Sequence, residues 1–443
     1  MSAPASPKGH WSERLALATY SLLMWLAQPM LLLKLLWRAR REPVYGQFLA
    51  QRFGFYGDVR PEGPLVWVHA VSLGETRALA PLLAQWRAQW PGLRLLLTHG
   101  TATGREAGAA LLRAGDVQVW QPWDTPGATA RFVRHFRPRW GVLLETEVWP
   151  NWVQACYAAQ TPLYLVNARL SAKSLRQAQR LAALAVPAYR HLAAVWPQSQ
   201  EHAVRLRALG ASPEAPTGNI KFDIEPDPAQ WEQGQALCQS LDRLVVLLAS
   251  SREGEERMWL DAWRARQARG DVLPAVQWLI VPRHPQRFDA VAQLLQSAGL
   301  TVARRSVDGS VFSQADVWLG DTLGEMPFYY GLSAVALLGG SFAPLGGQNL
   351  IEAAACRCPV VMGPHTFNFA QAAQMAQEAG AALEQADMAA ALDSALALVQ
   401  DPAALETASS AAWAFAQAHR GAVLRLSAAL AQRVEAAQRH TWV

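Results

Sequence analysis

The stretch AVALLGGSFAPLGGQNLIEAAA, residues 334–355, indicates the fold because it joins three elements of different character. It opens with a short apolar run, passes through two Gly-Gly pairs and ends in helix-forming residues. A strand, a tight turn and a helix in this order are the repeating unit of parallel α/β sheets. Asn349 and Glu352 lie one turn apart, so both side chains point the same way from the start of the helix.

Similar apolar runs recur along the chain and alternate with longer helical patterns. Those of the first half span residues 64–68, 94–98, 117–120, 141–145, 162–166 and 193–196. Those of the second half span residues 244–249, 277–281, 316–320, 334–340 and 359–363. The alternation predicts an α/β protein with two doubly wound, Rossmann-like domains.

A proline- and acid-containing stretch, FDIEPDPAQ at 222–230, separates the two series and reads as a linker. We therefore expect an N-terminal segment at residues 1–41, a first domain at 42–225, and a second domain at 226–443 that includes the terminal helices.

The composition excludes several classes of protein. Hydrophobic residues make up 51% of the 443 residues and charged residues 17%, which is incompatible with general disorder. The net charge of +5 is spread along the chain, which favours anionic ligands or a membrane surface and argues against a nucleic-acid partner. The four cysteines show neither zinc spacing nor a Cys-x-x-Cys pair, so we expect free thiols in a reducing compartment.

The N-terminus carries an uncharged, mostly apolar run from Leu15 to Leu33, long enough for a helix to cross a bilayer. Arginines at 38, 40 and 41 follow it, and this positive charge predicts that the rest of the chain lies in the cytoplasm. Gln28, Pro29 and Lys34 weaken a clean span, so a helix lying in the interface remains open. A buried helix of a soluble protein is a further alternative.

Ligands bind parallel sheets beyond the carboxyl ends of the strands. In the second half these ends are polar, basic and rich in glycine, as a phosphorylated ligand requires. Ser250 and Ser251 are candidate donors to phosphate, and the helix start near Gln348 offers N-H groups. Glu352 suits a ribose diol, since a carboxylate repels phosphate. A glycine-rich turn with a carboxylate that serves only the helix dipole would leave the same pattern.

In the first half Glu75 begins the helix that follows the first strand, where it can act as a general base. A helix-start acid without a catalytic role is the plain alternative. Glu145 and Glu147 follow one further strand, and Arg169 and Lys221 follow others, and together they predict a charged wall of the site.

The sequence contains no Gly-x-Gly-x-x-Gly after the first strand and no P-loop motif, which argues against dinucleotide oxidoreductases and P-loop enzymes. No cluster of His, Asp and Glu has metal-ligand spacing, so we expect neither a metal nor another cofactor.

Seven motifs in order resemble those of the 3-deoxy-D-manno-octulosonic acid (Kdo) transferases of lipopolysaccharide synthesis. They are HAVSLGE (69–75), ETEVWPN (145–151), NARLS (167–171), GNIKFD (218–223), VPRHPQRF (281–288), GDTLGEM (320–326) and GGSFAPLGGQNLIEAAA (339–355). The resemblance implies a GT-B glycosyltransferase with two Rossmann-like domains facing a cleft, the acceptor on the N-terminal domain and the nucleotide sugar on the C-terminal domain. It further implies transfer of Kdo from CMP-Kdo to the lipid A precursor (lipid IVA), with inversion and without a metal, at the cytoplasmic face of the inner membrane, to which a single N-terminal helix anchors the protein.

The resemblance also implies roles for particular residues. Glu75 matches the general base, and Glu145 and Lys221 match positions that support the transition state. The residues that match the CMP-binding segments are Pro282, Arg283, Gly324, Glu325, Met326, Asn349, Leu350, Ile351 and Glu352. Arg252 stands where the family usually has His, so the role of that side chain is open; Arg can meet a phosphate or the sugar carboxylate.

Two further classes remain alternatives. One is another GT-B enzyme, either a nucleotide-sugar transferase acting on a membrane lipid or a sugar epimerase. The other is a membrane-tethered, two-lobed sugar-binding protein without catalysis, which predicts that Glu75→Ala leaves all function intact. The sequence leaves the number of Kdo residues transferred and the oligomeric state open.

Overall fold

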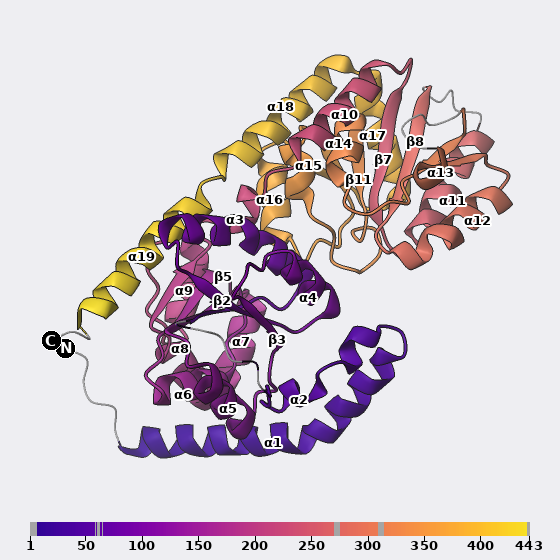
Figure 1. The fold of residues 1–443 in the computed structure, drawn as a ribbon. Coiled ribbons are helices and arrows are strands. Elements are labelled where there is room, and N and C mark those ends of the chain that lie inside the picture. The colour runs from indigo at the N-terminus through magenta and orange to yellow at the C-terminus, as the bar shows by residue number, and fades with distance from the viewer. Residues whose placement is uncertain are drawn as a thin grey trace. The chain divides into compact units, whose positions relative to one another are not determined.

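The computed structural model describes residues 7–57, 59, 63, 65–269, 275–308 and 314–440. Residues 1–6 of the expected anchor segment, and Pro64 in the first expected strand, lie outside these ranges. The chain forms two compact units, one of Met1–Asp223 with Gly421–Val443 and the other of Ile224–Arg420 (Figure 1). We refer to them as unit 1 and unit 2.

Unit 1 contains one six-stranded sheet with all strands parallel, in the order β3-β2-β1-β4-β5-β6. Its strands are β1 (Leu65–His69), β2 (Arg94–His99), β3 (Val117–Trp120), β4 (Trp140–Leu144), β5 (Leu163–Ala168) and β6 (Ala194–Pro197). Val66 of β1 lies opposite Leu95 of β2 and Trp140 of β4. This order reverses direction between β1 and β4, the point where doubly wound sheets bind ligands.

Helices and short 3-10 turns surround this sheet. They are α1 (Pro7–Ala39), η1 (Pro43–Gly46), α2 (Leu49–Arg52), α3 (Leu73–Gln89), α4 (Ala102–Ala109), α5 (Pro126–Phe136), α6 (Pro150–Ala158), α7 (Ala172–Arg180), α8 (Ala182–Arg190), α9 (Gln200–Arg207), η2 (Ile220–Asp223) and α19 (Ala422–His440). The strands are mostly apolar because both faces of the sheet are covered, and every residue of β1 is buried.

Unit 2 contains a second parallel sheet, in the order β13-β12-β11-β7-β8-β10-β9. Its strands are β7 (Leu244–Ser251), β8 (Val276–Pro282), β9 (Val302–Arg304), β10 (Val317–Leu319), β11 (Val335–Leu338), β12 (Val360–Met362) and β13 (Ala382–Glu384). The apolar runs predicted five of these strands. The sequence pattern missed β9 (VAR) and β13 (ALE), because each is short and ends in a charged residue, so that neither forms an apolar run.

The helices of unit 2 are α10 (Pro228–Gln239), α11 (Glu255–Ala268), α12 (Phe288–Ser297), α13 (Arg305–Asp308), α14 (Met326–Leu332), α15 (Leu350–Ala355), α16 (Ala370–Glu378), α17 (Met388–Gln400) and α18 (Pro402–Ala418), with the 3-10 turn η3 (Pro285–Arg287). The core of this unit joins β7, β8, β10 and β11 to α11, α12 and α17. Two Rossmann-like α/β units with parallel sheets confirm the predicted fold class.

The expectation that the second domain continues to residue 443 is wrong. The chain returns to unit 1 at Gly421, and α19 lies against α3 and η2. Asp223 explains the return locally, because its carboxylate accepts hydrogen bonds from the backbone N-H groups of Gly421 and Val423 at the start of α19. A carboxylate in this position satisfies N-H groups that the helix itself leaves unpaired.

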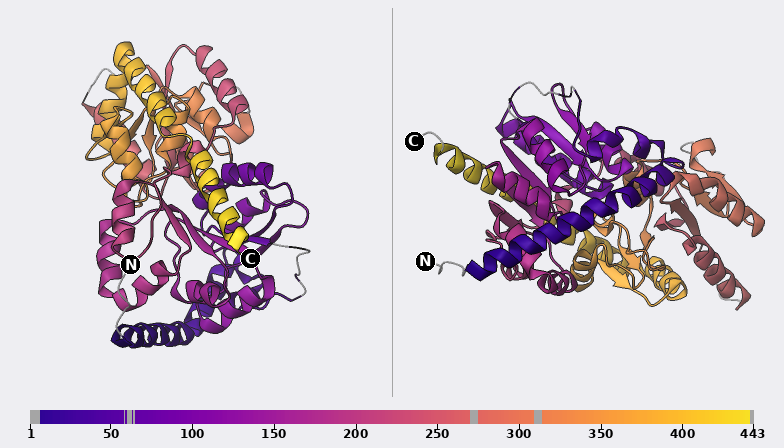
Figure 2. Two further views of the ribbon diagram at one scale, coloured as in Figure 1. Left: turned by 90° about the vertical axis from the view of Figure 1, so that its left-hand side faces the viewer. Right: turned by 90° about the horizontal axis from the view of Figure 1, so that it is seen from below.

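The N-terminal helix α1 lies along the side of unit 1, beside α6, α8 and η1 (Figures 1 and 2). Its part from Trp11 to Ala39 has the length and apolar character to cross a membrane. The half-buried positions recur every three or four residues, and Tyr20, Ser21 and Gln28 are among them. Large apolar side chains face away from the unit and are 57–74% exposed, namely Trp11, Leu15, Leu22, Leu23, Trp25, Leu26, Met30, Leu33 and Trp37.

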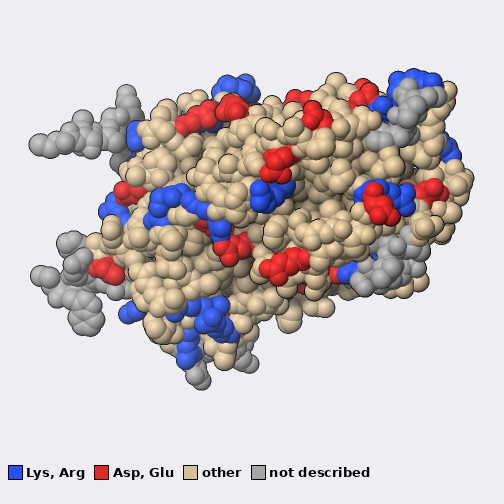
Figure 3. Space-filling model, turned by 90° about the horizontal axis from the view of Figure 1, so that it is seen from above, with Lys and Arg blue, Asp and Glu red and all other residues tan. Residues whose placement is uncertain are grey.

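Cysteines 156, 238, 356 and 358 are all free thiols, as predicted. Positive and negative side chains are mixed in small groups over the face shown in Figure 3. That face carries no extended basic stripe of the kind that binds nucleic acid.

Candidate functional site

Glu75 lies in the first turn of α3, directly beyond the carboxyl end of β1. Its carboxylate accepts hydrogen bonds from Val71 N at 2.8 Å and from Ser72 Oγ at 2.9 Å, and Ser72 in turn accepts one from Glu75 N. This reciprocal arrangement is a variant of the capping box in which the carboxylate reaches the N-H of the residue before the N-cap, so Glu75 stabilises the start of α3 whatever its role in chemistry. Burial raises the pKa of Glu75, and the negative charges of Glu145 and Glu147 raise it further.

Glu145 follows β4 and is 3% exposed. Its carboxylate forms ion pairs with Lys221 Nζ at 2.6 Å and with Arg169 Nε at 2.7 Å. Burial alone would raise the pKa of Glu145, but the two cations outweigh it and hold the pKa below its ordinary value. The predicted charged wall thus exists in unit 1, and a buried carboxylate with two cationic partners organises it.

Two unusual backbone conformations position Glu145 and the loop that carries Lys221. Glu145 and Asn167 both have positive φ angles, 57° and 51°, which are uncommon for residues other than glycine. Asn167 is fully buried, and its Oδ1 accepts a hydrogen bond from Ile220 N, which fixes the loop that carries Lys221. Strained, buried positions of this kind cluster at functional sites.

A second acid, Glu147, lies two residues beyond Glu145. Its Oε2 accepts a hydrogen bond from Trp149 Nε1 at 2.8 Å and lies 3.8 Å from Nε2 of the buried His69. Burial opposes ionisation of Glu147, but His69 and Trp149 lower its pKa overall. The carboxyl ends of β1 and β4 therefore hold three acids, of which Glu75 is the one whose pKa is raised.

In unit 2 the glycine-rich loop after β11 is organised by Glu255, which is fully buried. Its carboxylate accepts hydrogen bonds from the backbone N-H groups of Gly340, Phe342 and Ala343. These N-H groups are therefore occupied by the protein's own carboxylate. Gly339 packs so closely against the end of β7 that an added Cβ would lie 2.4 Å from Ser250 O, so packing requires a glycine there.

The segment from Asn349 to Glu352 begins α15. Asn349 Oδ1 accepts a hydrogen bond from Ile351 N, so that its side chain caps the helix. The side chains of Leu350 and Ile351 are 1% and 2% exposed and belong to the interior. Glu352 is half-buried.

Gly324, Glu325 and Met326 form the turn into α14. Gly324 has a φ of 81°, which favours glycine. The Glu325 carboxylate pairs with Arg305 at 2.8 Å and also accepts a hydrogen bond from Thr322. Partial burial opposes ionisation of Glu325, but Arg305 and Thr322 lower its pKa overall. Glu325 thus fixes this turn by an ion pair within unit 2.

Basic side chains gather beyond the carboxyl ends of β7 and β8. Pro282 is buried, and Arg283 is half-buried with its N-H donating to Ser251 O at 2.9 Å. Burial lowers the pKa of His284, and the nearby Arg252 and Arg283 lower it further. Arg252, Arg283 and His284 all follow the carboxyl ends of β7 and β8, a placement suited to an anionic ligand.

Ser251 does not have the role that the sequence suggested. It is fully buried, and its hydroxyl donates to Glu256 Oε1 at 2.6 Å, while Arg287 pairs with the same carboxylate. The hydroxyl of Ser251 is therefore engaged inside the unit. Ser250 has a φ of 54°, and its hydroxyl donates weakly to Met326 Sδ at 3.8 Å.

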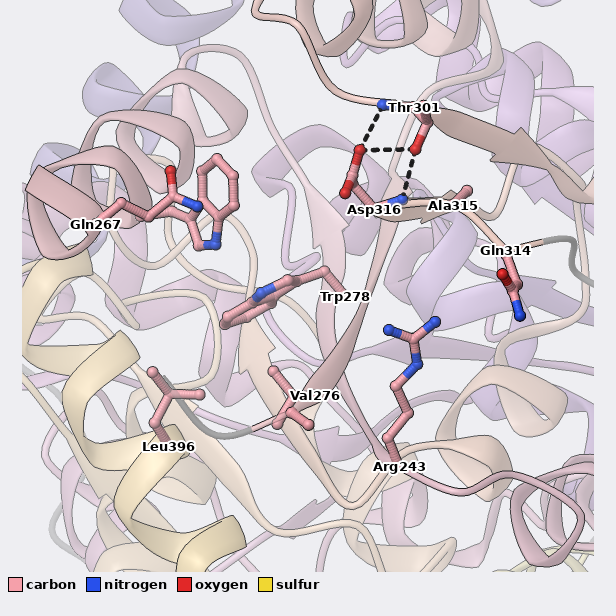
Figure 4. Close-up of a pocket in the computed structure, with 11 residues that line it drawn as sticks. Arg243, Gln267, Val276, Trp278, Thr301, Gln314, Ala315, Asp316 and Leu396 are labelled. Carbon is pink, nitrogen blue, oxygen red and sulfur yellow. Dashed lines mark hydrogen bonds between the residues drawn. The ribbon is translucent and has the colours of Figure 1, made fainter. Parts of the chain in front are cut away.

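A cavity of about 370 Å³ lies elsewhere in unit 2 (Figure 4). Arg243, Val276, Thr301 and Asp316 line it, and each stands at or just before the amino end of a strand. None of the predicted site residues lines it. The cavity is thus at the edge of the sheet opposite to the one where α/β sheets bind ligands.

Sequence reasoning assigned no role to three buried residues that hold site segments in place. Asp124 accepts hydrogen bonds from Asn151 N and Trp152 N at the start of α6. Asn167 and Glu255 hold the Lys221 loop and the glycine-rich loop, as described above. Each acts on residues far away in the sequence, so no local spacing reveals the contact. The positive φ of Asn167 is a structural signal that the sequence does not display.

Comparison with known proteins identifies the family. Residues 47–224 match the family model described as 3-deoxy-D-manno-octulosonic-acid transferase (kdotransferase). A 3-deoxy-D-manno-octulosonic acid transferase of Bordetella pertussis is 48% identical over 93% of this chain and 98% of its own, and that of Haemophilus influenzae is 33% identical over 92% and 96%.

Among solved structures, UDP-GlcNAc 2-epimerase from Neisseria meningitidis has a TM-score of 0.53 with 14% identity, covering 84% of this chain and all of its own. This likeness shows the fold alone, since transferases and epimerases share it. The identity over nearly the full length of the two transferases goes further than the fold. The chain belongs to the 3-deoxy-D-manno-octulosonic acid transferase family and is a glycosyltransferase that adds Kdo in lipopolysaccharide biosynthesis.

Proposed function

We propose that the enzyme transfers Kdo from CMP-Kdo to the lipid A precursor, lipid IVA, with inversion at the anomeric carbon, and that Glu75 is the general base. The observation that carries this proposal is the grouping of Glu75 with Glu145, Lys221 and Arg169 beyond β1 and β4, where the sheet order reverses. A partly buried acid with a raised pKa is the kind of group that accepts a proton during catalysis.

The reaction is then a single displacement. The acceptor hydroxyl gives its proton to Glu75 while its oxygen bonds to the anomeric carbon of Kdo. The bond from that carbon to the phosphate oxygen of CMP breaks, and the electron pair leaves with the phosphate. Lys221 and Arg169 keep Glu145 ionised, and the negative charge of Glu145 favours the protonated form of Glu75. The pKa of Glu75 is therefore raised, which makes its carboxylate a stronger base toward the acceptor hydroxyl.

Unit 2 is the proposed donor side. Arg252 and Arg283 offer positive charge to the phosphate of CMP and to the Kdo carboxylate, and the ring of His284, whose pKa is lowered, offers a hydrogen bond. We propose that Glu352 accepts hydrogen bonds from the ribose hydroxyls, and that the turn of Gly324, Glu325 and Met326 together with Pro282 shapes the nucleotide site through its backbone. The backbone N-H groups of Gly340, Phe342 and Ala343 already donate to Glu255, so we propose that the arginines, and not this loop, bind the phosphate. Such cations can carry the charge of the leaving group without a metal.

The N-terminal helix supports a location at the cytoplasmic face of the inner membrane. The polar side chains of Tyr20, Ser21 and Gln28 hydrogen-bond to unit 1, while the apolar ones face outward. A helix that crossed the bilayer would carry these contacts away from the folded unit. We therefore propose that α1 lies flat in the interface, with its apolar face in the lipid and Arg38, Arg40 and Arg41 near anionic head groups.

The test is transfer from CMP-Kdo, generated in situ, to tetraacylated lipid IVA, with product mass followed for wild type and Glu75→Ala, with and without EDTA. Product formed by wild type but not by Glu75→Ala, in equal amounts with and without EDTA, supports the proposal. The product mass then gives the number of Kdo residues added. Wild-type protein that is folded but inactive with intact donor would refute this donor and acceptor pair and favour another nucleotide sugar or membrane lipid. Equal activity of Glu75→Ala would refute the assignment of the base.

A further inference from the structure

A buried carboxylate, Asp124, connects the N-terminal helix to the catalytic side of unit 1. Asp124 lies between β3 and α5 and is 3% exposed. Its Oδ2 accepts hydrogen bonds from Tyr20 Oη at 2.9 Å and from Asn151 N at 3.1 Å, and its Oδ1 accepts one from Trp152 N at 2.8 Å. The two N-H groups belong to the first turn of α6, so Asp124 caps that helix from outside while also holding α1.

A second set of contacts runs parallel to the first. Asn151 is 3% exposed, and its Nδ2 donates to Asp124 O at 2.8 Å. The hydroxyl of Ser21 lies 2.9 Å from Asn151 Oδ1 and 2.7 Å from Leu17 O, so its proton is shared between these two acceptors. Tyr20 and Ser21, which are neighbours in α1, thus contact Asp124 and Asn151, the two residues that fix the start of α6. Gln28 Nε2, two turns further along α1, donates to Thr125 Oγ1 at 3.4 Å.

The start of α6 matters because the catalytic segment ends there. Only Thr146, Glu147, Val148 and Trp149 separate Glu145 from the Pro150 that begins the helix. Glu145 already has a positive φ, and Trp149 holds the carboxylate of Glu147. The segment between Glu145 and Pro150 is therefore too short and too constrained to absorb a shift at the start of α6, and such a shift would move Glu145.

Asp124 depends on these donors. No Lys or Arg forms a salt bridge with it among the residues that the structure describes. Burial raises the pKa of Asp124 to about 6, and the hydrogen bonds from Asn151, Tyr20 and Trp152 limit the rise. Removing one donor from a buried carboxylate leaves part of its desolvation cost uncompensated, so the remaining contacts must rearrange.

We propose that Tyr20 and Asp124 are positioning residues for Kdo transfer, through which the docked helix α1 holds the start of α6 and hence Glu145 in their catalytic arrangement. The membrane helix is then part of the catalytic framework of unit 1 and not only an anchor. The catalytic consequence rests on the proposed function, whereas the structural coupling does not.

The test compares Tyr20→Phe and Ser21→Ala with wild type as full-length protein in detergent. Loss of one hydrogen bond to the buried carboxylate is expected to lower kcat about tenfold. The KM for lipid IVA and the binding to anionic vesicles stay at the wild-type values, because the apolar face of α1 is unchanged. Tyr157→Phe, on the exposed side of α6 with its ring stacked on His191, is the matched control and keeps wild-type kcat.

Hydrogen exchange gives a readout that does not need activity. Amide exchange in residues 145–152 is expected to become faster in Tyr20→Phe and to remain unchanged in Tyr157→Phe. Unchanged exchange and kcat in Tyr20→Phe, or a raised KM and weaker vesicle binding with kcat intact, would overturn the proposal and leave α1 as an anchor alone. Faster exchange in a protein whose wild type transfers no Kdo would keep the coupling and refute the proposed function.

Discussion

Replacing Glu75 by Gln separates the two roles that the structure allows for this residue. The amide oxygen of Gln can still accept a hydrogen bond from Val71 N, and its NH₂ group can donate to Ser72 Oγ, so the capping box survives. The amide cannot take a proton from the acceptor. If Glu75 is the base, the variant folds normally and loses catalysis.

The expected sizes of the two effects differ enough to distinguish them. Loss of a helix cap costs about 1 kcal/mol of stability, whereas loss of a general base costs about 10²- to 10⁴-fold in rate, or roughly 3–5 kcal/mol of transition-state free energy. Since the folded state raises the pKa of Glu75, the ionised carboxylate costs stability at neutral pH, and this cost disappears as pH falls through the raised pKa. Glu75→Gln is therefore expected to unfold no more easily than wild type at pH 7.

The assay is single-turnover transfer to lipid IVA together with chemical denaturation. Ser199→Ala, which removes the cap of α9 in the same unit, is the control for stability and should lose about 1 kcal/mol while keeping the transfer rate. Activity of wild type should fall on the acid side as Glu75 becomes protonated, starting at higher pH than for an ordinary Glu. In Glu145→Gln this acid limb should move to lower pH, because a neighbouring negative charge is removed.

Two results would refute this reasoning. One is a transfer rate of Glu75→Gln within about threefold of wild type, which is too small a change for the loss of a base. The other is an acid limb that keeps its position in Glu145→Gln.

Three further experiments test other parts of the protein. Lys221→Met should destabilise unit 1 by about 2–4 kcal/mol, and adding Glu145→Gln should recover part of this loss of stability. Hydrogen exchange of the β4 amides measures both changes, and strictly additive losses in the double variant would contradict the ion pair. Arg252→Ala should raise the KM for CMP-Kdo about tenfold with no change in the KM for lipid IVA, and an equal rise in both would count against a donor contact. Replacing Leu22 and Leu26 together by Ser should weaken binding to anionic vesicles at least tenfold, whereas Leu424→Ser on α19 should not; equal effects would argue against α1 as the lipid-binding face.

Much of the site follows from the sequence because it lies where strands end. Glu75, Glu145 and Lys221 were located by their positions after apolar runs and by motif resemblance, and the structure brings Glu145 and Lys221 into contact. The function of each neighbouring group was harder to predict. Ser251 looked like a phosphate donor and proved to be bound to Glu256, and Asn349 proved to cap its helix. Hydroxyl and amide groups can serve the fold or a ligand equally well, and only their partners decide which.

By itself the sequence determined that this chain folds into two parallel α/β units, because strands buried on both faces are mostly apolar and glycines stand where the chain turns closely. It also determined the family, through motifs that follow those strands. Only the tertiary structure decided that α19 returns to unit 1, that Glu255 fills the glycine loop, and that Asp124 joins α1 to α6. The physical reason is that these choices rest on single buried carboxylates meeting N-H or O-H groups from distant parts of the chain, contacts that leave no periodic trace in the sequence.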